Sequence, residues 1–215
     1  MCRYIRMIAS GRRPQEARPC LIPPASLVGM KRQDLTPGIF TITDVLTAAE
    51  CTHLIAFADA QGFDVATINA WDGPRLDLET RNNGRVIADD FDLAKRLWKR
   101  VAELVPSMRL GRQARGLNER FRFYRYAPGQ RFAWHADAPF ARENGELSLF
   151  TFMVYLNGGY QGGATRFESL AVQGQPGTAL VFEHGLIHEG GEVTEGVKYV
   201  LRSDVMYGRM GQLAG

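Results

Sequence analysis

The sequence predicts a mainly β fold in which two α-helices precede a series of strands, and three observations support this. From Leu117 onward, apolar and polar residues alternate with a period of two, which is typical of strands. Glycine-rich turns, such as those at 157–159 and 175–177, divide this part of the chain into short segments. Ahead of Leu117, two segments repeat their apolar residues at helical spacing. The expected fold class is therefore α+β, with a β-sandwich as its main body.

The first helix is expected from Thr47 to about Ala60, after a short strand over residues 38–46. Thr47 and Glu50 have the spacing of a capping box, in which each side chain accepts a hydrogen bond from the other residue's backbone N–H. The apolar residues of its buried face are Leu54, Ile55 and Ala58. His53 is expected at an ordinary surface or packing position of this helix.

The second helix is expected from about Asp89 to Leu104. An aspartate caps its start, and Pro106 ends it because proline cannot continue a helix. Its apolar residues recur at helical spacing: Phe91, Leu93, Leu97, Trp98, Val101 and Leu104. Both helices are expected to brace one face of a sheet.

The strands of the main body are expected over short ranges after Leu117. These ranges are 119–127, 131–136, 147–156, 163–168, 178–183, 186–193 and 197–207. Between Phe63 and Val86 the chain is polar, with Gly73-Pro74 as an expected turn and residues 81–84 as an expected loop. No internal repeat is evident, so residues 33–215 are expected to form a single domain.

Residues 1–32 are expected to be an irregular basic extension. They contain seven Lys or Arg residues, one acid (Glu16) and several prolines, without a sustained period. The remaining residues contain 19 bases and 22 acids, so the net charge of +3 belongs to the extension. The basic balance is therefore poor evidence for nucleic-acid binding. Translation from Met30, just before the first well-patterned segment, is a hypothesis that intact mass would test.

The composition is that of a globular protein outside the membrane. Hydrophobic residues make up 45% of the chain, but no run approaches the roughly 18 apolar residues of a membrane helix. The three cysteines, Cys2, Cys20 and Cys51, are spaced too irregularly for a zinc cluster or a disulfide framework. We therefore expect a reducing, cytoplasmic setting, with no membrane or nucleic-acid partner and an undetermined oligomeric state.

The motif that organises the chain is His135-Ala136-Asp137. Side chains at i and i+2 of a strand leave the same face, so an imidazole and a carboxylate converge on one point. His188, in a distant strand, can supply a third ligand. Two histidines and one carboxylate that leave open positions on a metal are the arrangement of non-haem Fe(II) oxygenases. Lys198 follows ten residues after His188.

These residues resemble a known family. Tyr126, Gly129 and Gln130, then His135 and Asp137, and far downstream His188, Gly196 and Lys198 are similar to the prolyl 4-hydroxylase-like branch of the 2-oxoglutarate and Fe(II)-dependent dioxygenases. The likeness runs from about residue 38 to residue 207. It implies a double-stranded β-helix, or jelly roll, with two or more bracing N-terminal helices, and Fe(II) and 2-oxoglutarate as cofactor and co-substrate. Ascorbate is a further candidate cofactor.

The resemblance also implies roles for residues around the metal. His135, Asp137 and His188 would be the metal ligands, with no catalytic residue beyond that centre. Lys198 would bind the distal carboxylate of 2-oxoglutarate, because a carboxylate in an apolar barrel is costly to desolvate without a cation. Tyr126 and Thr151 would hydrogen-bond the same co-substrate. Candidates for substrate contact are Arg202, Arg122 and Tyr124. Arg202 is also a candidate for the co-substrate, or for a pair with Asp204.

The implied reaction is hydroxylation of an unactivated C–H bond, with a prolyl residue of a peptide or protein as the first candidate substrate. Free amino acids and small metabolites are the alternative. The chain lacks the arginine-rich signature that nucleic-acid demethylases carry after the second metal histidine, so that branch is not expected. His184 and His188 have the spacing of a helical zinc pair, but their surroundings have strand composition. His184 is expected to face away from the metal or to line the rim.

Two alternatives remain open. A non-enzymatic jelly roll that binds a metal or another ligand would have no reason to keep the three ligands together with Lys198. Residues 109–125 carry six arginines against only Glu119. They are expected to form a solvated basic face, with binding of an acidic substrate as the alternative.

Overall fold

The computed structural model describes residues 29–70 and 73–211. Residues 1–28 of the expected extension therefore lie outside the described residues, whereas Arg32 already begins the first strand. No helix in the described ranges is long and apolar enough to cross a lipid bilayer. Cys51 is buried and free.

The described residues contain two helices and a succession of mostly short strands. The helices are α1 (Ala48–Gln61) and α2 (Phe91–Val101). The strands before α2 are β1 (Arg32–Thr36), β2 (Ile39–Ile42), β3 (Asp64–Val65), β4 (Ile68–Ala70), β5 (Gly73–Arg75) and β6 (Gly84–Asp89). The strands after α2 are β7 (Met108–Arg109), β8 (Arg112–Leu117), β9 (Arg120–Tyr126), β10 (Phe132–His135), β11 (Leu147–Tyr155), β12 (Gln161–Gly162), β13 (Thr165–Phe167), β14 (Ala171–Val172), β15 (Ala179–Glu183), β16 (His188–Gly190), β17 (Val193–Glu195) and β18 (Lys198–Arg209).

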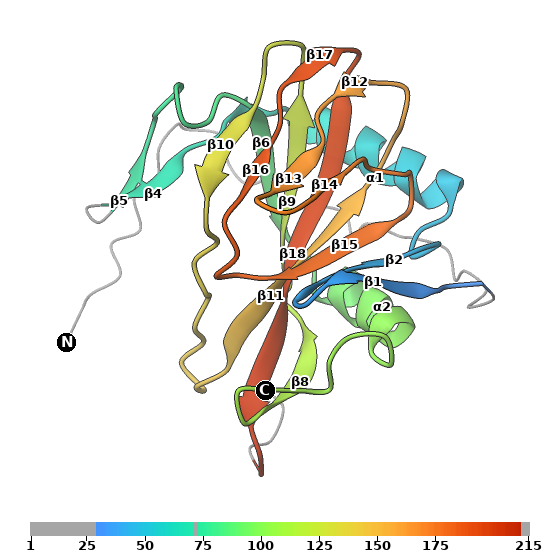
Figure 1. The fold of residues 1–215 in the computed structure, drawn as a ribbon, viewed down its shortest axis with the longest axis vertical. Helices are drawn as coiled ribbons and strands as arrows, with labels where there is room; N and C mark the ends of the chain where they lie inside the picture. Colours follow the sequence, from blue (N-terminus) through green and yellow to red (C-terminus); the bar gives the residue numbers. More distant parts are fainter. Residues whose placement is uncertain (1–28, 71–72, 212–215) are drawn as a thin grey trace.

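Two sheets form the body of the molecule. The large sheet has the strand order β1-β2-β15-β11-β18-β9-β6-β3, with β8 also paired to β18. The small sheet has the order β10-β16-β13-β14 and lies in front of the large sheet in Figure 1. Pairing is antiparallel throughout both sheets, and neighbours such as β11 and β18 are far apart in sequence. This is the sandwich that the alternating pattern predicts.

The large sheet separates two cores. On one face, alternate residues of β9 and β11, such as Phe121, Phe123, Phe150 and Phe152, belong to an apolar cluster that also contains helix residues. On the other face, the intervening residues of the same strands, such as Tyr124, join a second cluster shared with the small sheet. Successive strand residues point to opposite faces, so one stretch of chain builds both cores.

Both helices begin with the caps that the sequence predicts. Thr47 and Glu50 form a capping box at the start of α1. Asp90 caps α2 through a hydrogen bond from the backbone N–H of Leu93. The second helix is shorter than expected, because Asp89 ends β6 and pairs with Arg120 of β9. The buried helix residues that join the first cluster are Cys51, Leu54, Ala58, Leu93, Ala94, Leu97 and Val101.

Seven strands after residue 117 lie at predicted ranges, whereas β12, β14, β17 and several strands before residue 117 were not predicted. The strands at expected places are β9, β10, β11, β13, β15, β16 and β18. The region 63–86, expected to be turns and loops, contains β3, the β4-β5 hairpin and the start of β6. Gly73 and Pro74 lie in β5 instead of at a turn. These segments are short; β4 and β5 pair with each other locally, whereas β6 pairs with β3 and with the distant β9.

Candidate metal centre

Three potential metal ligands converge between the two sheets. His135 at the end of β10 and His188 at the start of β16 are paired residues of the small sheet. Asp137 follows β10 and is held by a backbone hydrogen bond from its N–H to the carbonyl of His184 (3.0 Å). One donor atom from each of the three ligands lies within 4.8 Å of the other two. The Nε2 atoms of His135 and His188 lie 3.8 Å and 3.7 Å from carboxylate oxygens of Asp137.

Both histidines present Nε2 to this point. Nδ1 of His135 lies 2.7 Å from the carbonyl of Ala133, and Nδ1 of His188 lies 2.9 Å from the carbonyl of Leu186. Because a carbonyl only accepts, each Nδ1 carries the proton and each Nε2 keeps a free lone pair. Burial lowers the pKa of both imidazoles, and for His135 burial together with neighbouring His188 lowers it to about 4. Both are therefore neutral at pH 7, as a metal ligand must be.

Aromatic rings fix the planes of the two imidazoles. The ring of Phe132 stacks on His135 with centroids 3.5 Å apart. Phe182 of β15 meets His188 edge to face at 4.5 Å. These contacts hold the imidazoles in place and keep water from one side of each ring.

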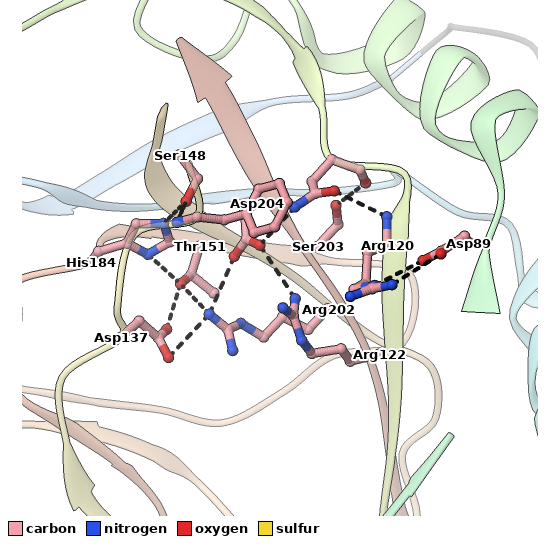
Figure 2. A network of polar contacts seen from close by, with 12 residues as sticks. Asp89, Arg120, Arg122, Asp137, Ser148, Thr151, His184, Arg202, Ser203 and Asp204 are labelled. Carbon is pink, nitrogen blue, oxygen red and sulfur yellow. Dashed lines mark hydrogen bonds and ion pairs between the residues drawn. The ribbon is translucent and has the colours of Figure 1, made fainter. Parts of the chain in front are cut away.

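Asp137 is the anchor of a buried polar network (Figure 2). One carboxylate oxygen accepts a hydrogen bond from the hydroxyl of Thr151, and the other forms an ion pair with Arg202 (3.1 Å). Burial alone would raise the pKa of this carboxyl, but Arg202, His188 and the Thr151 hydroxyl hold it far below the usual range. Asp137 is therefore ionised and oriented.

His184 belongs to this network and not to the ligand set. Its side chain is buried (5% exposed), and its two ring nitrogens lie 3.0 Å from Thr151 Oγ1 and 2.8 Å from Ser148 Oγ. Figure 2 shows this chain of contacts from Ser148 through His184 and Thr151 to Asp137. His184 is thus separate from the three ligands and lines neither of the two cavities that His135 lines, but it is buried instead of lying at the rim, because it has two hydroxyl partners.

Lys198 lies in the cavity that the three ligands also line. Its side chain is 2% exposed, and its ammonium donates to the carbonyl of Gly163 (2.6 Å) and lies 5.3 Å and 5.5 Å from the ring centres of Tyr126 and Tyr155. Among the described residues it forms no ion pair, and burial lowers its pKa to about 7. A buried ammonium without a carboxylate fits an anionic ligand.

The other residues predicted to contact the co-substrate also line this cavity. Tyr126 is paired with Lys198 in the sheet, and burial raises its pKa to about 12, so its hydroxyl keeps its proton. Thr151 lines the cavity too, but its hydroxyl is engaged with Asp137 and His184, at the end of the cavity where the three ligands lie. Two donor histidines, a carboxylate and a remote cation fit Fe(II) together with a dicarboxylic acid.

The three residues predicted to contact substrate lie beside the centre. Arg202 pairs with both Asp137 and Asp204, and these carboxylates raise its pKa above the usual range although burial opposes them. Arg122 pairs with Asp204 (3.3 Å). Tyr124 lies next to Arg81, whose guanidinium carbon is 4.5 Å from the ring centre. The sequence offered no signal for Arg81, which stands in a stretch expected to be a loop.

The six arginines of residues 109–125 do not form one patch. Among their partners are Glu183 for Arg109, Asp89 for Arg120 and Asp204 for Arg122. Arg112 and Arg115 donate to backbone carbonyls, and Arg125 donates to the hydroxyl of Tyr199. Of these six arginines, only Arg122 lines the cavity beside the metal centre.

Comparisons with known proteins agree with this geometry. Residues 121–203, which include all three ligands and Lys198, match the sequence model of the 2OG-Fe(II) oxygenase superfamily. A comparison with curated protein sequences finds no match.

Solved prolyl hydroxylases share the fold. A viral collagen prolyl hydroxylase from Paramecium Bursaria Chlorella virus-1 is 22% identical, with a TM-score of 0.57 over 78% of this chain and 95% of that one. A Pseudomonas putida prolyl-4-hydroxylase is 20% identical, with a TM-score of 0.57 over 81% and 94%. A Trichoplax adhaerens prolyl hydroxylase, solved with a peptide of hypoxia inducible factor, is 18% identical, with a TM-score of 0.57 over 79% and 84%.

These neighbours identify the two-sheet sandwich as a jelly roll, mainly β, with two helices in the described residues. The predicted resemblance is therefore confirmed: residues 121–203 match the 2OG-Fe(II) oxygenase superfamily by sequence, and most of the chain shares the fold of solved prolyl hydroxylases.

Proposed function

We propose that the protein is an Fe(II)- and 2-oxoglutarate-dependent dioxygenase that hydroxylates an unactivated C–H bond. The observation that carries this is the convergence of three metal donors with a buried, unpaired ammonium in one cavity. A binding module for a metal alone would gain nothing from burying Lys198, whereas a dicarboxylic co-substrate needs it.

His135, Asp137 and His188 would hold the ferrous ion through Nε2, a carboxylate oxygen and Nε2. When bound, iron and 2-oxoglutarate would supply the oxidising chemistry, in which one oxygen atom of dioxygen enters the succinate formed as 2-oxoglutarate loses carbon dioxide, and the other is transferred to the substrate. The two protonated Nδ1 atoms and the Thr151 hydroxyl would keep the three donors in place. The cytoplasm, predicted from the cysteine pattern, would keep the iron ferrous.

Lys198 would bind the distal carboxylate of 2-oxoglutarate and so select a dicarboxylic acid over a monocarboxylic one. Its ammonium can donate three hydrogen bonds, of which Gly163 accepts one. Tyr126, with its hydroxyl protonated, would donate to the same co-substrate. The apolar wall, which includes Phe182 and Val200, would exclude water from the bound dicarboxylate.

A prolyl residue of a peptide or protein is the substrate that we propose first. It is supported by three of the solved structures that share this fold, which are prolyl hydroxylases, one of them holding a peptide. A free amino acid or small metabolite is the second candidate, because the cavity beside the metal centre is rich in arginine. A prolyl-containing peptide and free proline can be compared directly in the same assay.

Anaerobic addition of Fe(II) and 2-oxoglutarate tests the proposed centre. We expect a weak visible charge-transfer band near ~530 nm, the signature of a 2-oxo acid chelated to ferrous iron. Lys198→Met should need far more 2-oxoglutarate for the same band, whereas His53→Ala, an exposed histidine on α1, should behave as wild type. A wild-type protein that binds Fe(II) but gives no band would indicate a metal-binding module instead. If the band forms, succinate release on admission of oxygen, measured with each candidate in turn, would identify the substrate.

A further inference from the structure

A second cavity, of about 390 Å³, adjoins the metal centre. It shares His135, Asp137, Tyr124 and Arg202 with the cavity that holds Lys198, but Lys198 itself does not line it. Once 2-oxoglutarate occupies the first cavity, this second one is the space in which a substrate can approach the metal. We call it the outer cavity.

The outer cavity is lined by more cations than anions. Four arginines and two carboxylates contribute to its wall: Arg81, Arg85, Arg122, Arg202, Asp137 and Asp204. Both carboxylates already form ion pairs with Arg202, and Asp204 also pairs with Arg122. Among the described residues, Arg81 and Arg85 form no ion pair with a carboxylate. Ferrous iron and 2-oxoglutarate carry opposite double charges, so their binding leaves this positive excess in place.

Arg81 is the most unusual of these residues. It is 4% exposed, and its guanidinium carbon lies 4.5 Å and 4.2 Å from the ring centres of Tyr124 and Phe132. Its Nε donates to Asn83 (2.8 Å), but its Nη2 is buried and has no hydrogen-bond partner. A buried donor without a partner costs about 1–3 kcal/mol, and more when it is charged. Stacking occupies the faces of the guanidinium and leaves this edge for a ligand.

Arg85 also lines the outer cavity and lies close enough to Arg81 for the two charges to interact. Its side chain donates to the hydroxyl and carbonyl of Thr67 (2.9 Å and 3.4 Å), both neutral groups. Burial lowers the pKa of Arg85, and the charges of Arg81 and Arg122 lower it further, although Tyr124 and the carboxylate of Asp64 act in the opposite sense. Burial would raise the pKa of Tyr124, but Arg81, Arg202 and Arg122 lower it to about 8. The wall therefore has an unmet demand for negative charge.

We propose that the substrate carries a carboxylate and that Arg81 and Arg85 bind it in the outer cavity. This rests on the proposed function, because it assigns a substrate class to that reaction. Arginine forks bind carboxylates through two parallel hydrogen bonds, and such a pair is strongest where water is excluded. The carboxylate can belong to a free amino acid or to an acidic or carboxy-terminal residue of a peptide.

The test compares substrates with and without the charge. Wild-type protein loaded with Fe(II) and 2-oxoglutarate is assayed for succinate with the free L-amino acids and their amides. N-acetyl-L-proline is compared with its amide, and prolyl peptides with an adjacent Glu are compared with the same peptides carrying Gln. We expect the carboxylate member of a productive pair to have a kcat/KM at least about tenfold higher, the effect of one charged hydrogen-bonded contact. A preference for the carboxylate that is seen only with amino acids, or only with Glu peptides, identifies which kind of carboxylate the outer cavity binds.

Variants test the two arginines separately. Arg81→Gln and Arg85→Gln should each raise KM for the carboxylate substrate about tenfold or more and leave KM for its amide nearly unchanged. Arg125→Gln is the matched control, because Arg125 of β9 contacts Tyr199 and does not line the outer cavity. If Arg81→Gln does not fold, Arg85→Gln carries the test.

Two results would overturn the proposal while the proposed function stands. One is equal turnover, or none, of both members of every pair by a protein that forms the band near ~530 nm. The other is a carboxylate preference that survives in the folded arginine variants. Absence of the band would instead contradict the proposed function itself, so the two failures are distinguishable.

Discussion

The two faces of the large sheet use the same strands for different purposes. On β18, Tyr199, Leu201 and Val205 contact the core shared with the helices. The intervening residues Lys198 and Arg202 face the small sheet and line the cavity at the metal centre. On β11, Phe152 lies on the first face and Thr151 on the second. Burial is nearly complete on both faces, but the buried charges on the helix side, Glu50 and Arg100, pair with each other, whereas Lys198 on the inner face has no ion-pair partner among the described residues.

This difference shows where stability and function lie in the molecule. Burying apolar side chains stabilises the fold by about 25 cal/mol for each Å² removed from water. Buried charges cost free energy unless they are paired, and on the inner face Lys198 is unpaired and Arg202 keeps an unpartnered Nε. The apolar burial on the helix-covered face therefore stabilises the fold and offsets the cost of the buried charges on the inner face, which form a site for ligands. Each prediction below tests this division.

The largest effect is expected at a metal ligand. His188→Ala should abolish both the charge-transfer band and succinate formation, because two donors remain of three. His53→Ala is the matched control, since it removes an exposed histidine far from the strands of the site. Thermal unfolding of the metal-free variants should differ little from wild type. A His188→Ala protein with normal turnover would contradict the assigned ligand set.

A neighbouring pair on β11 compares the two faces directly. Phe152→Ala, on the helix-covered face, should lower the free energy of unfolding by about 3–5 kcal/mol, the cost of a cavity in a packed core. Turnover of the fraction that stays folded should persist. Met153→Ala, one residue on, should cost less stability because Met153 is only partly buried, but should weaken 2-oxoglutarate binding because it lines that cavity. Denaturant unfolding and co-substrate titration measure the two quantities. The reverse outcome would show that the faces are not separated in this way.

Thr151 tests the support around the metal ligands. Thr151→Val keeps the shape but removes the hydroxyl that donates to Asp137 and contacts His184. Loss of such a supporting hydrogen bond is expected to weaken metal binding about 10–100-fold. Titration with Fe(II) or Mn(II) measures this, and Thr151→Ser should restore most of the affinity. Unchanged affinity in Thr151→Val would show that the hydroxyl serves only packing.

The alternating strands could be predicted because their pattern is local. The ranges of β9, β11 and β18 follow from residues that alternate within one segment, and the cap of α1 follows from Thr47 and Glu50 alone. By contrast, β6 and β8 are polar on much of their length and exist because β9 and β18 pair with them. A pattern within the segment carries no record of such a partner.

The same limit applies to the site. His135 and Asp137 could be paired by their spacing in one strand, but the meeting of β10 with β16, which brings His188 to them, depends on the fold. From the sequence, Arg202 was a candidate for the substrate, for the co-substrate or for a pair with Asp204, which the structure contains, and Arg81 was not singled out. Only the three-dimensional arrangement places Arg202 on Asp137 and Arg81 on the ring of Phe132, beside His135. Contacts of this kind join residues from separate elements and leave no spacing rule.

The smallest predicted effect is a pH dependence set by Lys198. Burial lowers its pKa from 10.5 to about 7, so between these values the unfolded chain binds a proton that the folded, co-substrate-free protein does not. The contribution of Lys198 to stability is therefore complete above pH 10.5 and is lost as the pH falls to 7, by about 1.4 kcal/mol per pH unit. The proposed binding of 2-oxoglutarate uses the ammonium of Lys198, so its Kd should rise about tenfold per unit above pH 7. As the pH rises above 7, the stability of the protein should therefore increase while its affinity for 2-oxoglutarate decreases.

Other groups also titrate in this range, so the measurement is the difference between wild type and Lys198→Met. As the pH rises from 7 to 9, the free energy of unfolding of wild type should increase relative to that of Lys198→Met. The advantage of wild type in 2-oxoglutarate affinity should shrink over the same range. Circular dichroism melts and calorimetric titrations at matched pH measure the two. A stability difference that is flat over this range would show that Lys198 is charged in the free protein, and hence that an anion within the fold, not a ligand, satisfies it.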